Sequence, residues 1–534
     1  MRTVQVGDKD EISYSNPGDF ELLSINLIGP PILSSSGAFQ NKIYALQLVY
    51  TNFSIYEDIY SNCLTASITI FDGNSILTEF PIIGDEMIEI MFRSTNTEIA
   101  IHLKFRITGI SEIERLNENS NVYTLFLSSP ASIINEKQKI SKSFAGIKYK
   151  THKIIKHICE RYLNLKDESE ISFRKSGNLF IRNKDIMNDY FLLESESGYS
   201  EKYIAASKTP FEIINSLCKR SISSFGSLYY FFEDINSFRF INVEENSVQK
   251  KNRNIKRIVC FPQGIINDTL EDSKRSWNTA LSYSIKKRFD IFENMKRGMY
   301  SSEVTFLDLE KREHFTKKYY YQQEGAKYNH TSDGYLLTSK YSDLIHDVDN
   351  ESPSTVAAIV PMHFGDRQSQ DYTIHTHENF QRRMSMEAQL DGIILEIQIP
   401  GDSTGEISVG NFVYFSFISV RADSADETEE DPYLSGKYMI TRIHHHITKD
   451  ENRYTMIIEM ISDTVFKEYN VNNQGFESPS IQTNSEQIEL ESEQMEVSTS
   501  ARSNIIVDAN HAISRKRRNM KASVTITSEE RKNV

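Results

Sequence analysis

The residues best suited to metal chemistry are three consecutive histidines, His444, His445 and His446. They lie in an apolar stretch with the pattern of a β-strand. Successive side chains of a strand alternate between its faces, so His444 and His446 share one side while His445 points away. Zinc would need about two more ligands, and the sequence shows none at a matching spacing. We therefore expect a structural strand with partly exposed imidazoles and no metal site.

Other polar clusters depart from the motifs that they resemble. His375-Thr-His-Glu lacks the two histidines one helical turn apart that a zinc protease requires. The loop that starts at Asp347 has Ser352 where a calcium loop needs glycine, and Ala358 where it needs a bidentate glutamate. Residues 423–431 hold six acids. We interpret this segment as a solvated loop, although its charge suits a cation or a basic partner.

Motifs for nucleotide and hydrolase chemistry are missing. The sequence has no G-x-x-x-x-G-K-[ST] loop, no G-x-G-x-x-G turn and no G-x-S-x-G elbow. Glycoside hydrolysis by paired carboxylates stays an open possibility for this sequence, because the distance between two carboxyl groups in the folded protein decides whether they can carry out that reaction. The cysteines form no C-x-x-C pair, and we expect buried, reduced thiols at Cys63, Cys159, Cys218 and Cys260. The prediction is a non-enzymatic protein with no catalytic residue, no cofactor and no metal.

Composition indicates a large protein rich in strands. The chain has 534 residues, enough for about three or four domains plus a tail. Its 27 Tyr and 30 Phe against one Trp favour β-structure. A formal net charge of −14 argues against a dedicated nucleic-acid binder. The sequence has neither an apolar leader nor a stretch long enough to span a membrane, so we expect synthesis in a cytoplasm and no membrane span.

Changes in periodicity along the chain predict an α+β, mainly β fold. Short alternating runs predict a first β-barrel over 1–130, and a helical period predicts a helix-plus-hairpin domain over 131–250. We expect a mixed α+β region over 251–375 and a second β-barrel over 376–470. The remaining segment, 471–534, is polar, with six acids and no bases between Glu477 and Glu496. It is predicted to be an extended C-terminal tail, either mobile or ordered on a partner.

The clearest local signal is a capped helix followed by an aromatic hairpin. Thr209 can cap the helix, Pro210 suits its first position, and Glu212 completes a capping box. Apolar residues then recur at helical spacing. The hairpin that follows consists of Phe225-Gly-Ser-Leu-Tyr-Tyr-Phe-Phe, an acidic turn and Ser237-Phe-Arg-Phe-Ile-Asn. This unit must pack its apolar face on another element.

The order Pro-Phe-Glu-x-Ile-Asn, helix, Gly and two aromatic strands resembles the baseplate hub proteins of contractile-tailed bacteriophages. Further segments resemble the same family: Phe53-Ser-Ile-Tyr-Glu-Asp-Ile-Tyr with the strand after it, Tyr203-Ile-Ala-Ala-Ser-Lys, Ile399-Pro-Gly-Asp, Gly410-Asn-Phe-Val and Gly436-Lys-Tyr-Met-Ile-Thr-Arg-Ile-His-His. They cover about 20–130, 150–245 and 376–470. Region 251–375 and the tail depart from the pattern.

The resemblance implies two similar tube-type barrels per subunit and a homotrimer whose six barrels form a pseudo-sixfold ring. Such a ring joins a threefold central spike protein to the sixfold tail tube or its initiator, beside baseplate wedge proteins. Its lumen passes DNA and the tape-measure protein without specific binding. The resemblance thus implies a structural virion protein of the tail baseplate, made in the host cytoplasm, that assists genome ejection.

Two alternatives stay open. A hub or spike with peptidoglycan-degrading activity would need a lytic domain within 251–375. A hub of a bacterial contractile injection system, related to type VI secretion spikes, would share the barrels but should carry a repetitive terminal prism, which the sequence does not show. For ring closure we expect exposed edge strands around 65–71 and 413–417.

Overall fold

The computed structural model describes residues 16–465 except 34–38, 81, 118–119, 145–149, 168–172, 177–178, 183–188, 199–202, 250–254, 261–276, 309–311, 322–329, 331–334, 337–356, 362–369, 419–429 and 432. The predicted tail, most of the loop that starts at Asp347 and most of the acidic segment 423–431 therefore lie outside the described residues. The described part is mainly β with several helices, which confirms the predicted α+β, mainly β class.

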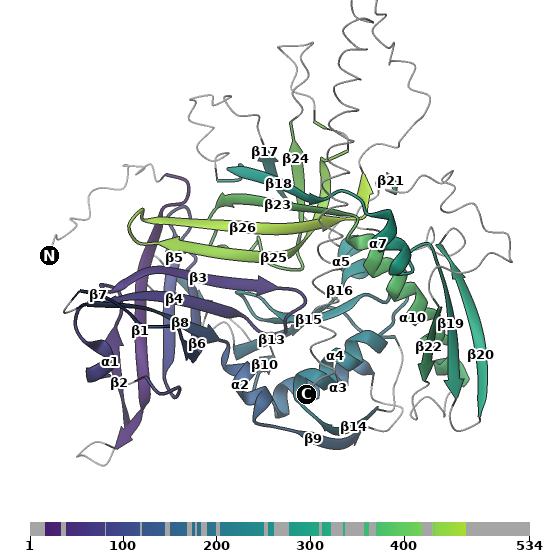
Figure 1. Cartoon of the computed structure of the whole chain (residues 1–534), viewed down its shortest axis with the longest axis horizontal. Coiled ribbons are helices and arrows are strands. Elements are labelled where there is room, and N and C mark those ends of the chain that lie inside the picture. Colours follow the sequence, from purple (N-terminus) through teal and green to yellow (C-terminus); the bar gives the residue numbers. More distant parts are fainter. Residues whose placement is uncertain are drawn as a thin grey trace, which may run out of the picture. The chain divides into compact units, whose positions relative to one another are not determined.

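One sheet of 14 strands dominates the protein (Figure 1). Its N-terminal half-sheet consists of β1 (Phe20–Leu33), β2 (Phe39–Ala45), β3 (Tyr50–Asp58), β4 (Thr65–Asp72), β5 (Met87–Ser94), β6 (Ile101–Ile110), β7 (Glu114–Asn117) and β8 (Ser120–Ser128). Its C-terminal half-sheet consists of β17 (Lys256–Cys260), β18 (Ser282–Lys287), β23 (Ile393–Pro400), β24 (Phe412–Phe417), β25 (Gly436–Thr448) and β26 (Arg453–Ser462). The halves join where β3 pairs antiparallel with β25, a pairing that we call the seam.

The strands predicted as two barrels thus share one sheet, and among the described strands no pairing closes either half on itself. The predicted edges were wrong. Residues 65–71 lie in β4, which pairs with β3 and β8, and residues 413–417 lie in β24, which pairs with β17 and β25. Both β4 and β24 are paired with strands from other parts of the sequence, and local periodicity does not reveal such pairings. The strands at the two ends of the described order are β2 and β18.

Alternation of buried and more exposed residues along the strands builds the apolar core. In β5, Ile88, Ile90 and Phe92 are buried, while the residues between them are partly exposed. Because strand side chains point alternately to the two faces, one side of each strand enters the interior. A single apolar cluster runs through both half-sheets and includes Phe232 and Ile241 of the aromatic hairpin.

The predicted helix and hairpin form a second core beside the sheet. The middle unit contains α2 (Pro130–Glu136), β9 (Ile140–Phe144), α3 (Thr151–Arg161), β10 (Lys166–Asp167), β11 (Phe173–Ser176), β12 (Leu179–Arg182), β13 (Tyr190–Leu193), β14 (Tyr203–Lys208), α4 (Pro210–Arg220), β15 (Tyr229–Glu233), β16 (Phe238–Asn242) and α5 (Val243–Gln249). The backbone N–H of Glu212 donates to the Thr209 hydroxyl, and the Thr209 N–H donates to the Glu212 carboxylate at 2.8 Å. This confirms the capping box.

A smaller sheet and a long helix complete the described fold. β19 (Ser301–Asp308) pairs with β20 (Glu313–Tyr320) and with β22 (Ala357–Pro361), and β21 (Tyr335–Leu336) pairs with β27 (Thr464–Val465). The short helices are α1 (Ile76–Glu79) and α7 (Ile291–Lys296). The helix α10 (Gln370–Leu390) leads into β23 (Ile393–Pro400). In the described part of the chain, no helix has the length and apolarity to span a membrane.

Candidate functional site: the seam and the free sheet edges

The seam is the place where the two half-sheets become one, and its outward face carries two of the three histidines. Tyr56 pairs with His444, and their rings stack at 4.5 Å between centroids. Ser54 pairs with His446, and its hydroxyl lies 3.1 Å from His444 Nε2 and 3.2 Å from His446 Nδ1. Burial, reinforced by the neighbouring imidazoles, lowers the pKa of His444 to about 4.

The inward face of the seam carries a buried polar group instead of a continuous apolar surface. The Glu57 carboxylate of β3 lies 2.5 Å from His445 Nε2 of β25, and neither side chain has any exposed surface. His445 Nδ1 lies 2.8 Å from the Tyr454 hydroxyl of β26. Burial raises the pKa of Glu57, while the hydrogen bond and charge of His445 oppose that rise. Each half-sheet contributes to the group, so it links them directly.

The aromatic hairpin holds the C-terminal half-sheet through one buried arginine. The Arg239 guanidinium donates to the Val409 carbonyl at 2.9 Å and contacts the Asp234 carboxylate at 3.2 Å. It also pairs with Glu194 and donates to the Asn411 side chain at 3.2 Å. Burial disfavours its charge, but these carboxylates outweigh that effect and raise the pKa of Arg239 further. Arg239 therefore fixes the loop before β24 to the middle unit.

The hairpin also contacts the N-terminal half-sheet. The Leu64 N–H donates to Glu233 at 2.9 Å, and Asn62 donates to the Phe231 carbonyl at 2.8 Å. From the other side, Arg383 of α10 donates to the carbonyls of Cys218 and Ser227, each at 3.1 Å. The middle unit thus connects the two half-sheets beyond the seam itself.

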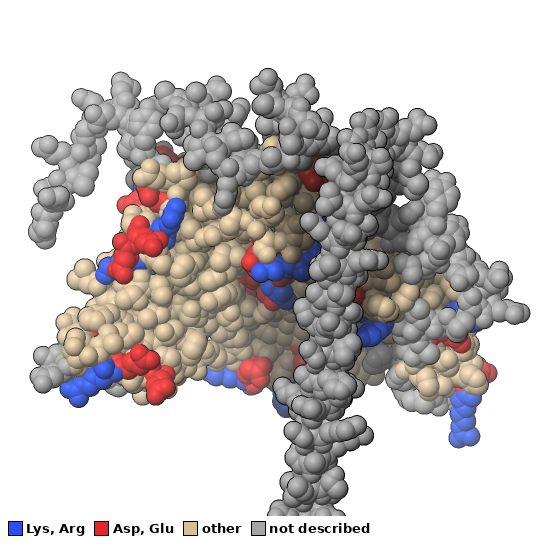
Figure 2. All heavy atoms as spheres, turned by 45° about the horizontal axis from the view of Figure 1, so that its top comes forward, with Lys and Arg blue, Asp and Glu red and all other residues tan. Residues whose placement is uncertain are grey.

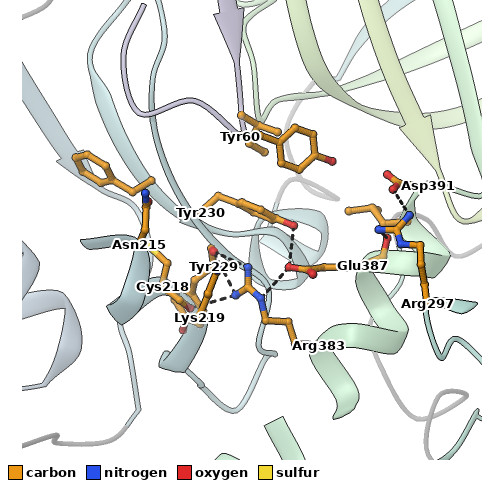
Figure 3. A pocket seen from close by; sticks show the side chains of 13 residues that line it. Tyr60, Asn215, Cys218, Lys219, Tyr229, Tyr230, Arg297, Arg383, Glu387 and Asp391 are labelled. Atoms are coloured by element: carbon orange, nitrogen blue, oxygen red, sulfur yellow. Dashed lines mark hydrogen bonds and ion pairs between the residues drawn. The ribbon is translucent and has the colours of Figure 1, made fainter. Parts of the chain in front are cut away.

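A pocket of about 360 Å³ lies where these segments meet (Figure 3). Arg383 lies against Glu387 at 2.8 Å, Arg297 against Asp391 at 2.6 Å, and the Tyr230 hydroxyl points to Glu387. The pocket is lined by Ile59, Tyr60, Asn215, Cys218, Lys219, Tyr229, Tyr230, Phe231, Arg297, Arg383, Glu387, Leu390 and Asp391. Its arginines and acids neutralise one another, which suits a junction between units better than a site for a charged substrate.

Among the described strands, β2 and β18 each pair on one side only, and these free edges expose large apolar side chains. On the β2 side, Ile43 is 62% exposed and Leu48, just after the strand, is 88% exposed. Every residue of β18 except Lys287 is exposed, and Tyr283 and Ile285 lie among them. Phe292 in the adjacent helix α7 is 77% exposed. A strand that is exposed on both faces and at its edge has the backbone groups and the apolar surface to accept another strand.

Charged side chains on the face drawn in Figure 2 lie in small mixed groups of both signs, and other residues form most of that face. The described residues in this view form no continuous basic track of the kind that binds nucleic-acid backbones. Among all described residues, no group of three or more His, Cys, Asp and Glu is arranged to hold a metal.

The predicted alternation of the histidines is confirmed: His444 and His446 are partly exposed, and His445 faces away from them. His375 and His377 fall in α10. Of the acidic segment, the described Glu430 pairs with Arg257, and Asp431 accepts backbone N–H groups of a turn. The pairing of Glu57 with His445 was missed, although each stands at an inward position among isoleucines and phenylalanine, which signals a buried partner.

No protein-family model matches the sequence, and no curated protein matches it significantly. Similar solved structures include a tail protein from Neisseria meningitidis, with 10% identity, a TM-score of 0.46 and coverage of 83% of this chain and 97% of that one. A 43 kDa tail protein of prophage MuSo2 from Shewanella oneidensis has 10% identity, a TM-score of 0.44 and coverage of 83% and 99%. A component of the Escherichia coli type VI secretion system has 10% identity, a TM-score of 0.36 and coverage of 79% and 76%. A likeness of this degree transfers no function to this chain.

Proposed function

We propose that the protein is a structural subunit of a bacteriophage tail baseplate, in which three copies form a hub ring. The observation that carries this proposal is the pair of half-sheets fused side by side through β3 and β25. Because each chain supplies two β units, a threefold ring of chains presents six of them. Such a ring matches a threefold spike on one face and a sixfold tube on the other.

The free edges supply a means of closing the ring. β2 and β18 lie at opposite ends of the described strand order, so each chain carries one of each. Pairing β18 of one copy with β2 of the next is a heterologous contact, which closes into a ring when its rotation is one third of a turn. Exposed Ile43 on one edge and Tyr283 on the other would be buried by this contact.

The ring's work is mechanical and needs no catalytic residue. Its lumen passes DNA and the tape-measure protein, and a net charge of −14 disfavours retention of the DNA backbone. The partners are the central spike protein, the tail tube or its initiator, and the wedge proteins of the baseplate. The sequence resemblance to hub proteins, in the order of its motifs, supports this assignment.

Electron microscopy of the purified protein tests the proposal. We expect rings with threefold symmetry and six similar densities around a central hole. Particles of a single chain, or two-fold dimers without a hole, would contradict it. Co-expression with the tail-tube protein of the same genome should then give rings stacked on tubes. Rings that do not bind the tube would refute the adaptor role.

A further inference from the structure

The outward face of the seam brings two imidazole nitrogens to one point. His444 and His446 stand two residues apart on β25, so both side chains lie on the same, partly exposed face of the sheet. His444 Nε2 lies 3.1 Å and His446 Nδ1 lies 3.2 Å from the same atom, Ser54 Oγ of β3. The centroids of the two rings are 5.5 Å apart. Two rings that converge in this way can contact one small ligand together.

The other nitrogen of each ring is available to carry the ring hydrogen. The Ser54 hydroxyl has one hydrogen, so it donates to one imidazole and accepts the N–H of the other. Neither His444 Nδ1 nor His446 Nε2 has a hydrogen-bond partner among the described residues. Each ring can therefore place its hydrogen there and turn a lone pair toward Ser54. Neutral imidazoles with lone pairs of this kind are ligands for transition-metal ions.

An ion between the two rings needs only small movements of the side chains. A zinc–imidazole bond is about 2.0–2.1 Å long, so for an ion of that size each nitrogen would move about 1 Å toward the position of the Ser54 oxygen. The hydroxyl can leave this position by rotation about the single side-chain bond of serine. Tyr56 stacks on His444 at 4.5 Å between centroids and so limits the orientations of that ring. The arrangement is therefore close to a two-histidine chelate.

We propose that His444 and His446 bind a divalent transition-metal ion, with copper(II) preferred over nickel(II) and zinc. Zinc would lack two of its usual four ligands here, and the prediction of no metal site rests on that count. Copper(II) binds nitrogen ligands more tightly than the neighbouring ions do, and it accepts a tetragonal set of nitrogen and oxygen ligands. Water and the Ser54 hydroxyl can fill the remaining positions. The site belongs to a single chain and does not depend on the proposed ring.

Calorimetric titration of the full chain with copper(II), without an affinity tag and near neutral pH, tests the site. We expect one tight site per chain. His444→Gln and His446→Gln should each weaken it about tenfold or more, because a chelate loses its gain when one of two linked ligands is removed. His102→Gln is the matched control, since His102 is a partly exposed strand histidine that contacts Glu89 at 3.1 Å. It should leave the tight site unchanged. Equal affinities in the wild type and the first two variants would overturn the proposal.

Electron paramagnetic resonance tests the same site in the wild-type chain, so the result does not depend on the folding of any variant. With one equivalent of copper(II), we expect hyperfine coupling to two imidazole nitrogens. The His446→Gln protein should show coupling to one imidazole at this position. A wild-type spectrum without coupling to two imidazoles would contradict the chelate.

Discussion

One side chain, Arg239, makes several of the contacts between the middle unit and the C-terminal half-sheet. It is nearly inaccessible and binds two carboxylates, a carbonyl and an amide oxygen. A buried charge network of this kind gains little over apolar packing while intact, but it is costly to break because the remaining charges lose their partner.

We therefore predict that Arg239→Met lowers the free energy of unfolding by about 3–5 kcal/mol. The buried Asp234 and the partly buried Glu194 would keep their charge without a cation. Arg257→Met is the matched control, because Arg257 pairs with Glu430 while 57% exposed, and its loss should cost about 0–1 kcal/mol. Urea titration followed by circular dichroism gives both values. Equal losses in the two variants would contradict this account of Arg239.

Sequence patterns identified single residues well where the cause was local. The capping box at Thr209 and the alternation of the three histidines both follow from backbone geometry over a few residues. The partner of His445 lies 388 residues away in the chain, at Glu57. Only the seam brings the two together, so no local pattern predicts the pair. From the sequence alone, one can recognise only a charged residue at an inward-facing strand position.

At the scale of elements, the helix α4 depends on its first turn. Its capping box satisfies two backbone N–H groups that otherwise lack partners within the helix. We predict that Thr209→Ala lowers the free energy of unfolding by about 1 kcal/mol, and that Thr209→Ser restores most of it. Thermal unfolding measured for the three proteins in parallel tests this. A serine variant no better than alanine would exclude the cap as the cause.

The edges of the sheet were the main error of sequence analysis at this scale. Strand periodicity gave β4 and β24 correctly, but their neighbours come from other parts of the chain: β24 gains β17 from the 251–375 region, and β3 beside β4 gains β25. Which strand ends a sheet is a long-range property, so the ends of the described strand order, β2 and β18, needed the structure.

The edge strand β18 gives a prediction about assembly. Ile285→Lys adds a charge to an exposed edge, which opposes pairing with another strand, and should weaken association of copies at least tenfold, or about 1.4 kcal/mol. Ile204→Lys is the control, since Ile204 is an exposed isoleucine on β14 of the middle unit. Analytical ultracentrifugation over a concentration series compares them. Equal association of both variants would remove β18 from the interface.

At the scale of the whole molecule, the features described above join parts of the chain to one another. The seam links the two half-sheets, and the middle unit contacts both of them. The central claim is that three copies close into a ring. Mass photometry of the purified chain, with and without residues 471–534, tests it most directly. We predict particles of three times 61.6 kDa for the full chain, with any loss upon truncation assigning the tail to the subunit contact. Particles of one chain in the full-length sample would contradict the ring.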